Sequence, residues 1–239
     1  MQVEIWSDYG CPFCYIGKRR FEQALEQFPH RDQVQVVYRS FELDPNANYK
    51  PGLTLDELLS GKYGMSIEQA KAANENVTRQ AASVGLEYRM DQAVPANSFD
   101  AHRLAHYASQ HGVMKEMTER LFKAYFTEGQ NLQDRAVLAD LAAEVGLSRD
   151  EAAAVLDSEA FSTEVRADEE AAAKLGVRGV PFFVLGGRYA VSGAQPLEVF
   201  TDALQRAYAE SNPLVIVNED GDGGVCTDET CEVKGKENQ

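Results

Sequence analysis

The sequence contains no apolar run approaching the roughly 20 residues that a bilayer-spanning helix needs. Met1 leads directly into a strand-like segment, without the basic and then apolar stretch of a secretion signal. Positive charge is scarce as well, because 23 Lys and Arg face 38 Asp and Glu, for a net charge of −15 at pH 7. A chain this acidic repels a phosphate backbone. We therefore expect a soluble, cytoplasmic protein with neither a membrane nor a nucleic acid as its partner.

The noticeable exception to this scarcity is a short basic run formed by Lys18, Arg19 and Arg20. Short basic runs within a helix usually form a solvated face. We expect these side chains to lie on the exposed side of a helix rather than to bind nucleic acid.

Cysteine is scarce too, but its four residues come as two pairs. Cys11 and Cys14 lie in the motif CPFC, and Cys226 and Cys231 lie in CTDETC. In a long and apparently cytoplasmic chain, paired cysteines indicate redox chemistry or metal binding before a structural disulfide scaffold.

The first quarter of the chain reads as strand, helix and strand. Residues 2–7 and 33–41 have the character of strands, and residues 12–28 have apolar side chains at helical spacing. This order predicts a parallel crossover. A block of helices is expected over residues 54–175, where Thr54, Ser66 and Ser148 each begin a capping-box pattern.

The α/β pattern resumes after the helical block. Residues 181–193 read as two strands joined at a pair of glycines, and residues 196–209 read as an amphipathic helix. The segment 211–239 begins with the apolar run LVIV and becomes acidic and glycine-rich, so we expect a tail with little internal structure. We find no internal repeat. We therefore expect four parts along the chain. Residues 1–53 and 176–210 form the first and second parts of one α/β domain, residues 54–175 form a helical insertion between them, and residues 211–239 form an acidic C-terminal tail.

These motifs together resemble the thioredoxin fold as it is elaborated in the DsbA family, and most closely its cytoplasmic FrnE-like branch. The resemblance is carried by SDYGCPFCYIGKRRF, FELDP and LGVRGVPFFVLGGRYAVSGAQP, and it covers about residues 1–210. It implies an α/β protein: a thioredoxin-like fold with a large all-helical insertion and a C-terminal tail. It also implies an enzyme, a disulfide oxidoreductase or isomerase, in which Cys11 is the nucleophile, Cys14 resolves the mixed disulfide and Pro181 is cis.

The position of the CPFC motif supports the two cysteine roles independently. If Cys11 is the N-cap of the first helix and Pro12 its first residue, the thiolate faces the positive end of the helix dipole. Cys14 is then one turn along, within bonding distance of Cys11. Phe13 places an apolar residue between the cysteines and supplies no cation, so we expect a less oxidising pair than one with His there.

Val180 and Pro181 are the second half of the expected site. A cis bond between them places the Val180 backbone beside the dithiol, where it can pair with an extended peptide. Taken alone, the sequence would favour an ordinary trans proline at the start of a strand. We list Pro12, Phe13, Val180 and Pro181 as substrate-binding residues, and we expect an apolar groove formed with the insertion.

Other titratable residues are weaker candidates. Asp8 precedes CPFC and is expected to be a polar loop residue, although a carboxylate there can take up protons during exchange. His102 and His106 have the i, i+4 spacing of a zinc site, but the matching Glu and a third ligand are absent. We expect neither a metal nor a cofactor.

The tail pair Cys226 and Cys231 has strongly acidic surroundings, because residues 212–239 hold seven Asp or Glu against two Lys. Acidic neighbours disfavour a thiolate. We predict an auxiliary redox pair that exchanges with the CPFC disulfide. The alternatives are a local disulfide, two idle thiols, or a four-cysteine metal centre shared with CPFC.

Three functions remain open at this point. The first is thiol-disulfide exchange with protein or peptide substrates, with a thioredoxin-type or glutathione-type reductant as the recycling partner. The second is a glutathione-linked enzyme like the kappa-class transferases and 2-hydroxychromene-2-carboxylate isomerases, which typically have Ser where CPFC stands here. The third is a metal-binding or chaperone-like module without catalysis.

Overall fold

A four-stranded sheet organises the computed structural model, which describes residues 1–50 and 52–211. Its strand order is β2-β1-β3-β4, in which β1 is parallel to β2 and antiparallel to β3, and β3 is antiparallel to β4. The described elements follow the chain in this order: β1 (Gln2–Ser7), α1 (Pro12–Glu26), the 3-10 helix η1 (Arg31–Gln33), β2 (Gln35–Ser40), α2 (Leu55–Tyr63), α3 (Ile67–Ala82), α4 (Phe99–Gln110), α5 (Met114–Phe126), α6 (Arg135–Glu144), α7 (Arg149–Leu156), α8 (Ser162–Lys174), β3 (Phe182–Leu185), β4 (Tyr189–Ser192) and α9 (Leu197–Ser211).

The expected fold class is confirmed, because seven helices separate β2 from β3 along the described chain. The division of the chain at residues 53, 175 and 210 stays a prediction. The predicted tail, including Cys226 and Cys231, lies outside the described residues apart from residue 211. None of the helices in the described part is long and apolar enough to cross a bilayer.

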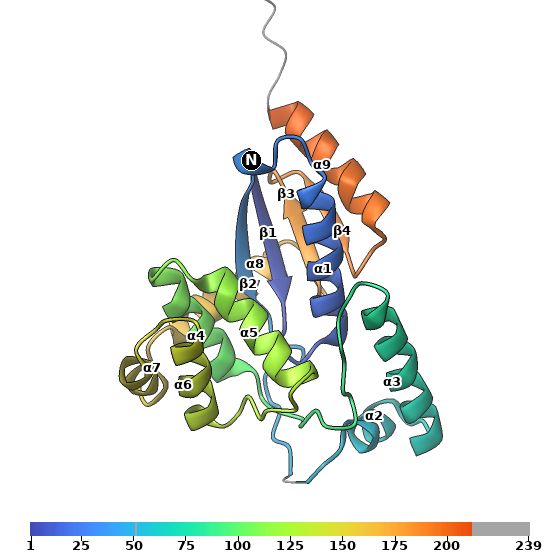
Figure 1. The fold of residues 1–239 in the computed structure, drawn as a ribbon, viewed down its shortest axis with the longest axis vertical. Helices are drawn as coiled ribbons and strands as arrows, with labels where there is room; N and C mark the ends of the chain where they lie inside the picture. Colours follow the sequence, from blue (N-terminus) through green and yellow to red (C-terminus); the bar gives the residue numbers. More distant parts are fainter. Residues whose placement is uncertain (51, 212–239) are drawn as a thin grey trace, which may run out of the picture.

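The central strand β1 is buried on both faces of the sheet. Val3 and Ile5 pack in one apolar cluster with side chains of α1 and α9, whereas Trp6 packs in another with Ala172 of α8. This division follows the alternation of side chains along a strand. Figure 1 shows α1 and α9 in front of the sheet and α8 behind it. Phe183 of β3 is fully buried, which stabilises the fold by about 2–3 kcal/mol relative to an exposed ring.

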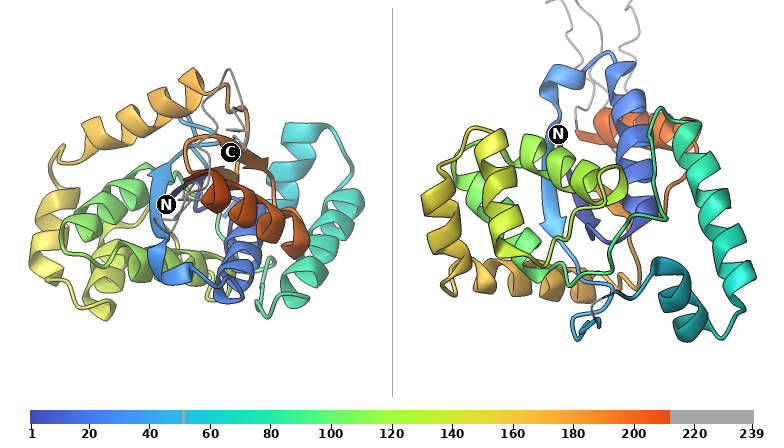
Figure 2. Two further views of the ribbon diagram at one scale, coloured as in Figure 1. Left: turned by 90° about the horizontal axis from the view of Figure 1, so that it is seen from above. Right: turned by 60° about the horizontal axis from the view of Figure 1, so that its bottom comes forward.

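Six of the seven described helices between β2 and β3 form two groups on either side of α1, and the seventh, α8, lies behind the sheet. Helices α2 and α3 lie on one side, and α4 to α7 lie on the other, as Figure 1 and the right-hand view of Figure 2 both show. The loops that connect the groups pass below the start of α1 in these views. The N-terminal end of α1 therefore lies between the two groups.

Capping interactions define where several inserted helices begin. Thr54 and Ser66 form reciprocal capping boxes with the third residues of α2 and α3, as predicted. The third prediction is only half right, because Ser148 accepts a hydrogen bond from the N–H of Glu151 without the return bond. The Glu151 carboxylate instead accepts a hydrogen bond from the hydroxyl of Tyr107, at 2.9 Å.

Candidate active site

Cys11 is the N-cap residue of α1, and Pro12 is its first helical residue. The first turn contains no acidic side chain, and no side chain caps the helix. The Cys11 Sγ therefore lies at the positive end of a helix dipole that no carboxylate of that turn offsets. This is the local environment that stabilises a thiolate.

Cys14 lies one turn into α1 and is buried even more completely than Cys11, with 1% of its surface exposed against 4%. Both are free thiols. The Asp8 N–H donates a weak hydrogen bond to Cys14 Sγ, at 3.5 Å. Burial, then the hydrogen bond and charge of Cys11, raise the pKa of Cys14 well above its ordinary value, and the charge of Asp8 adds to this. Cys14 is therefore held as the protonated partner of the pair.

The peptide bond between Val180 and Pro181 is cis, as the family resemblance implied. The Val180 carbonyl oxygen accepts a hydrogen bond from Cys11 Sγ at 3.6 Å, which brings together two residues 169 positions apart. Pro181 is buried, and its carbonyl oxygen accepts a hydrogen bond from the Gly193 N–H. The predicted second half of the site therefore lies beside the dithiol.

Gly17 is a site residue that the sequence reasoning missed. A Cβ atom added at Gly17 would lie 2.8 Å from Pro181 Cγ and 3.4 Å from Phe183 Cζ. Only a residue without a side chain lets α1 approach the Pro181 loop so closely. A glycine inside a helix costs about 1 kcal/mol of helix stability and therefore indicates a packing reason, which was the available signal.

A cavity of about 540 Å³ opens beside Cys11. The sequence predicted an apolar groove here, and most of the lining is apolar. The lining residues come from the CPFC loop, the loop after β2, α2, α3, the loop before α4, the end of α5 and the loop before β3, which contributes Val180. Three large hydrophobic residues that line it are exposed, namely Phe13, Leu43 and Tyr63. Among the described residues that line this cavity, Lys62 is the one cation.

Asp8 lies in the loop before CPFC, as expected, and is buried. Its carboxylate accepts hydrogen bonds from the N–H groups of Gly10, at 3.1 Å, and Leu43, at 2.7 Å. Burial alone would raise the pKa of Asp8, but His102, the Leu43 N–H group and Ser98 together outweigh it, so the pKa lies below its ordinary value. A charged carboxylate is therefore held directly beneath the dithiol.

His102 and His106 do not act together. His106 Nε2 lies 3.1 Å from both Ser40 Oγ and Asp168 Oδ2, whereas His102 Nε2 lies 3.8 Å from Asp8 Oδ1. Within the described residues, no group of three or more His, Cys, Asp or Glu side chains has the arrangement of a metal site.

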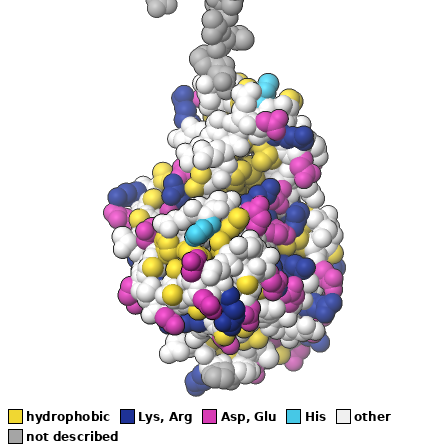
Figure 3. All heavy atoms as spheres, turned by 60° about the vertical axis from the view of Figure 1, so that its left-hand side comes forward, with side chains coloured by type: hydrophobic (Ala, Val, Ile, Leu, Met, Phe, Trp, Pro, Cys, Tyr) yellow, Lys and Arg dark blue, Asp and Glu magenta, His cyan; other side chains and the backbone are white. Residues whose placement is uncertain are grey.

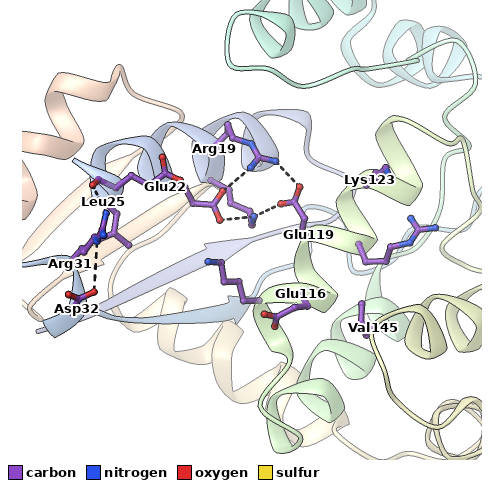
Figure 4. A pocket seen from close by; sticks show the side chains of 13 residues that line it. Arg19, Glu22, Leu25, Arg31, Asp32, Glu116, Glu119, Lys123 and Val145 are labelled. Carbon is purple, nitrogen blue, oxygen red and sulfur yellow. Dashed lines mark hydrogen bonds and ion pairs between the residues drawn. The ribbon is translucent and has the colours of Figure 1, made fainter. Parts of the chain in front are cut away.

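A second cavity, of about 780 Å³, lies between α1 and α5 and is lined by charged side chains (Figure 4). Glu119 of α5 forms ion pairs there with Lys18 and Arg19 of α1, and Tyr15 donates a hydrogen bond to it at 2.6 Å. Burial opposes the charge of Glu119, but Lys18 and the other donors hold its pKa below the ordinary value. These side chains satisfy one another and join α5 to α1.

The prediction of an exposed basic run is wrong for Lys18, which is only 2% exposed. Arg19 pairs with Glu22 and Glu119, and Arg20 donates a hydrogen bond to the Ala194 carbonyl oxygen. The contacts with Glu119 and Ala194 were invisible in the sequence because they join α1 to distant segments. On the face shown in Figure 3, Lys and Arg side chains are interspersed with Asp and Glu and form no broad basic area.

The sheet, the helix order and the dithiol at a helix N-terminus define a thioredoxin-fold disulfide oxidoreductase. Residues 2–205 match the model of the DsbA-like thioredoxin domain, and the chain belongs to this family. The family and the enzyme class expected from the sequence are thus confirmed.

Known proteins show how far the similarity extends. A crystal structure of a probable DsbA oxidoreductase from Streptomyces coelicolor is 46% identical, with a TM-score of 0.85, and the match covers 98% of this chain and 100% of that one. The uncharacterized protein YwbO from Bacillus subtilis (strain 168) is 28% identical over 206 residues, covering 85% of this chain and 96% of YwbO. A 2-hydroxychromene-2-carboxylate isomerase structure shares the fold at 19% identity and a TM-score of 0.67, over 88% of this chain and 98% of that one.

Proposed function

We propose that this protein exchanges disulfides with protein or peptide substrates through Cys11 and Cys14. The observation that carries the proposal is the placement of Cys11 at the N-terminus of α1, whose first turn holds no acidic side chain, beside the Val180 carbonyl. The Cys11 thiolate attacks one sulfur of the substrate disulfide, forms a mixed disulfide and releases the other sulfur as a thiolate. Cys14 then loses its proton and attacks Cys11 Sγ, which releases the second substrate sulfur. The substrate gains two electrons, and the CPFC pair becomes a disulfide.

Asp8 is the proposed acceptor of the Cys14 proton. It is charged and buried, and its charge is one cause of the raised pKa of Cys14. A thiol must lose its proton before it attacks a disulfide. A carboxylate held beneath the pair can take this proton without solvent entering the site.

The cavity beside Cys11 supports an extended peptide with an apolar side chain as the substrate. Its lining offers Phe13, Leu43 and Tyr63 as apolar contacts, and the Val180 backbone can pair with an extended chain. Glutathione carries two carboxylates, and Lys62 is the one cation among the described lining residues. The charge of the cavity therefore favours a peptide over a glutathione-linked reaction.

We place the protein in the FrnE-like branch and in the cytoplasm, with a thioredoxin-type or glutathione-type thiol to reduce the CPFC disulfide. Cys226 and Cys231 complete the proposal as an auxiliary pair that passes electrons to CPFC. Their acidic sequence surroundings support a more reducing pair.

The test compares Cys11→Ser with Cys14→Ser in insulin reduction and in trapping of mixed disulfides. Cys11→Ser should abolish activity without changing the thermal unfolding temperature, and Cys14→Ser should accumulate mixed disulfides with substrate. Normal insulin reduction by Cys11→Ser would refute the nucleophile assignment. If the purified protein contained bound metal, and neither substitution changed its behaviour in these assays, the metal-binding alternative would be favoured.

A further inference from the structure

A buried polar cluster lies beneath the dithiol, where β1 and β2 end. Its members are Asp8, which follows β1, Glu42, which follows β2, and His102 of α4, and all three are buried. The cluster contains two buried atoms without a hydrogen-bond partner among the described residues, His102 Nε2 and Glu42 Oε1. Buried polar atoms are rarely left unpaired, so this pair of atoms requires an explanation.

His102 is held close to Asp8 but just outside hydrogen-bond distance. Its Nε2 atom lies 3.8 Å from Asp8 Oδ1, and its ring packs on Tyr9 with ring centroids 4.7 Å apart. A shift of about 1 Å brings Nε2 within hydrogen-bond distance of the carboxylate. Imidazole is also the side chain whose charge changes most readily near neutral pH.

Asp8 is the nearest ionic partner of His102 among the described residues, because the other charged groups nearby pair with one another. Arg166 of α8 pairs with Glu42 and Glu169, and Asp168 pairs with Arg39 and His106. The titratable groups that interact with Asp8 or His102, from the elements packed against them, are Tyr9, Cys14, Glu42, Tyr49 and Tyr125. Arg166, Asp168 and Glu169 lie around them and act on Glu42 or on Tyr9. The largest of the effects that lower the pKa of Asp8 comes from His102.

We propose that His102 is a positioning residue that acts through Asp8 in the second step of exchange, an inference that rests on the proposed dithiol mechanism. When Cys14 attacks, its S–H bond breaks and the proton passes to the Asp8 carboxylate. His102 Nε2 then moves into hydrogen-bond distance and shares this proton. The Cys14–Cys11 bond forms as the bond between Cys11 and the substrate sulfur breaks, and the electron pair leaves with the substrate thiolate. When a thiol reductant later reduces the pair, the departing Cys14 thiolate recovers the proton.

The inference is tested on the full-length chain carrying Cys226→Ser and Cys231→Ser, so that only Cys11 and Cys14 react. The reduced protein is mixed with an aromatic disulfide whose released thiol absorbs visible light. The first release, which depends on probe concentration, reports the attack by Cys11. The second release, which does not, reports the attack by Cys14 on the mixed disulfide. Both rates are measured between pH 3 and 9 for His102→Phe, His102→Gln, Asp8→Asn and the combination of His102→Phe with Asp8→Asn.

The matched control is His106→Gln, because this histidine lies one turn further along α4 and binds Ser40 and Asp168 instead of Asp8. In His102→Phe, the first phase is expected to be unchanged and the second to slow about tenfold near neutral pH. The loss of the imidazole raises the pKa of Asp8, so the acid limb of the second phase should move to higher pH. Asp8→Asn should remove this limb, and adding His102→Phe should cause no further slowing. His106→Gln should leave both phases as in the wild type.

Identical second-phase profiles in His102→Phe and wild type would overturn the inference, as would an equal shift in His106→Gln. A further slowing of Asp8→Asn by His102→Phe would also overturn it, because His102 would then act independently of Asp8. If His102→Phe does not fold, the test rests on His102→Gln, which is a smaller and polar change. Gln cannot take up the proton, so His102→Gln should shift the acid limb of the second phase in the same direction. Absence of a second phase in the parent chain would instead overturn the dithiol mechanism itself.

Discussion

Replacing Gly17 with Ala tests whether α1 and the Pro181 loop must touch for the site to work. In an ordinary helix, this change adds about 1 kcal/mol of stability, because glycine is a poor helix former. Here the new Cβ would lie 2.8 Å from Pro181 Cγ, where ordinary contacts begin at 3.4 Å, so the rigid proline ring must retreat by about 0.6 Å. Overpacking of this kind costs about 1–3 kcal/mol. We expect a net loss of about 1 kcal/mol in the free energy of unfolding.

Gly61→Ala is the matched control, because Gly61 is also within a helix, α2, but a Cβ added there would contact nothing within 4 Å. It should raise the free energy of unfolding by about 1 kcal/mol. For a chain of this size, each kcal/mol moves the melting temperature by about 2–4 °C. Thermal unfolding followed by circular dichroism should therefore show Gly17→Ala and Gly61→Ala on opposite sides of the wild type.

Activity provides the second readout. The Val180 carbonyl oxygen lies 3.6 Å from Cys11 Sγ. A shift of Pro181 therefore also moves the carbonyl group that is hydrogen-bonded to the nucleophile. We expect kcat/KM for insulin reduction to fall about tenfold in Gly17→Ala and to stay unchanged in Gly61→Ala. If Gly17→Ala stabilises the protein as much as Gly61→Ala and keeps full activity, the packing argument is wrong.

Two further changes test other contacts. Glu119→Gln leaves the buried Lys18 with Glu22 as its remaining carboxylate partner, so it should lower the free energy of unfolding, measured in urea, by about 2 kcal/mol. The control Glu144→Gln removes a carboxylate from an exposed ion pair and should change the free energy of unfolding by less than about 0.5 kcal/mol. Equal effects of the two changes would mean that the burial of Lys18 is not what matters. Deleting residues 222–239 should leave Cys11 reactive but slow the recovery of the reduced enzyme by thiol reductants, and identical reduction potentials and turnover in the two forms would remove the tail pair from the cycle.

Local sequence signals predicted the framework of the site. The Cys11-Pro12 step predicted where α1 begins, because it depends only on neighbouring residues. The strand expected at residues 33–41 is β2, which is shorter at its start because residues 31–33 form a 3-10 turn. The cis bond before Pro181 could be expected only from the family resemblance.

Contacts between distant segments could not be predicted in this way. The burial of Asp8 depends on the Leu43 N–H, which reaches it from the loop after β2. The burial of Lys18 depends on Glu119, 101 residues further along the chain. Charge patterns in a sequence show which side chains are charged but not which distant segment will neutralise them, so Lys18 was assigned to the surface and Asp8 to a polar loop.

The hydrogen bond between Cys11 and Val180 has a consequence for biosynthesis, because it joins residues 169 positions apart. At about 5–20 residues per second, a ribosome needs about 10–30 s to add this length of chain. During that time β1 has no β3 to pair with, and both thiols of the nascent chain are without the loop that covers them in the folded protein. A newly made chain is therefore open to oxidation and to mispairing with other thiols before it can catalyse anything, and the last strands to be synthesised determine when that exposure ends.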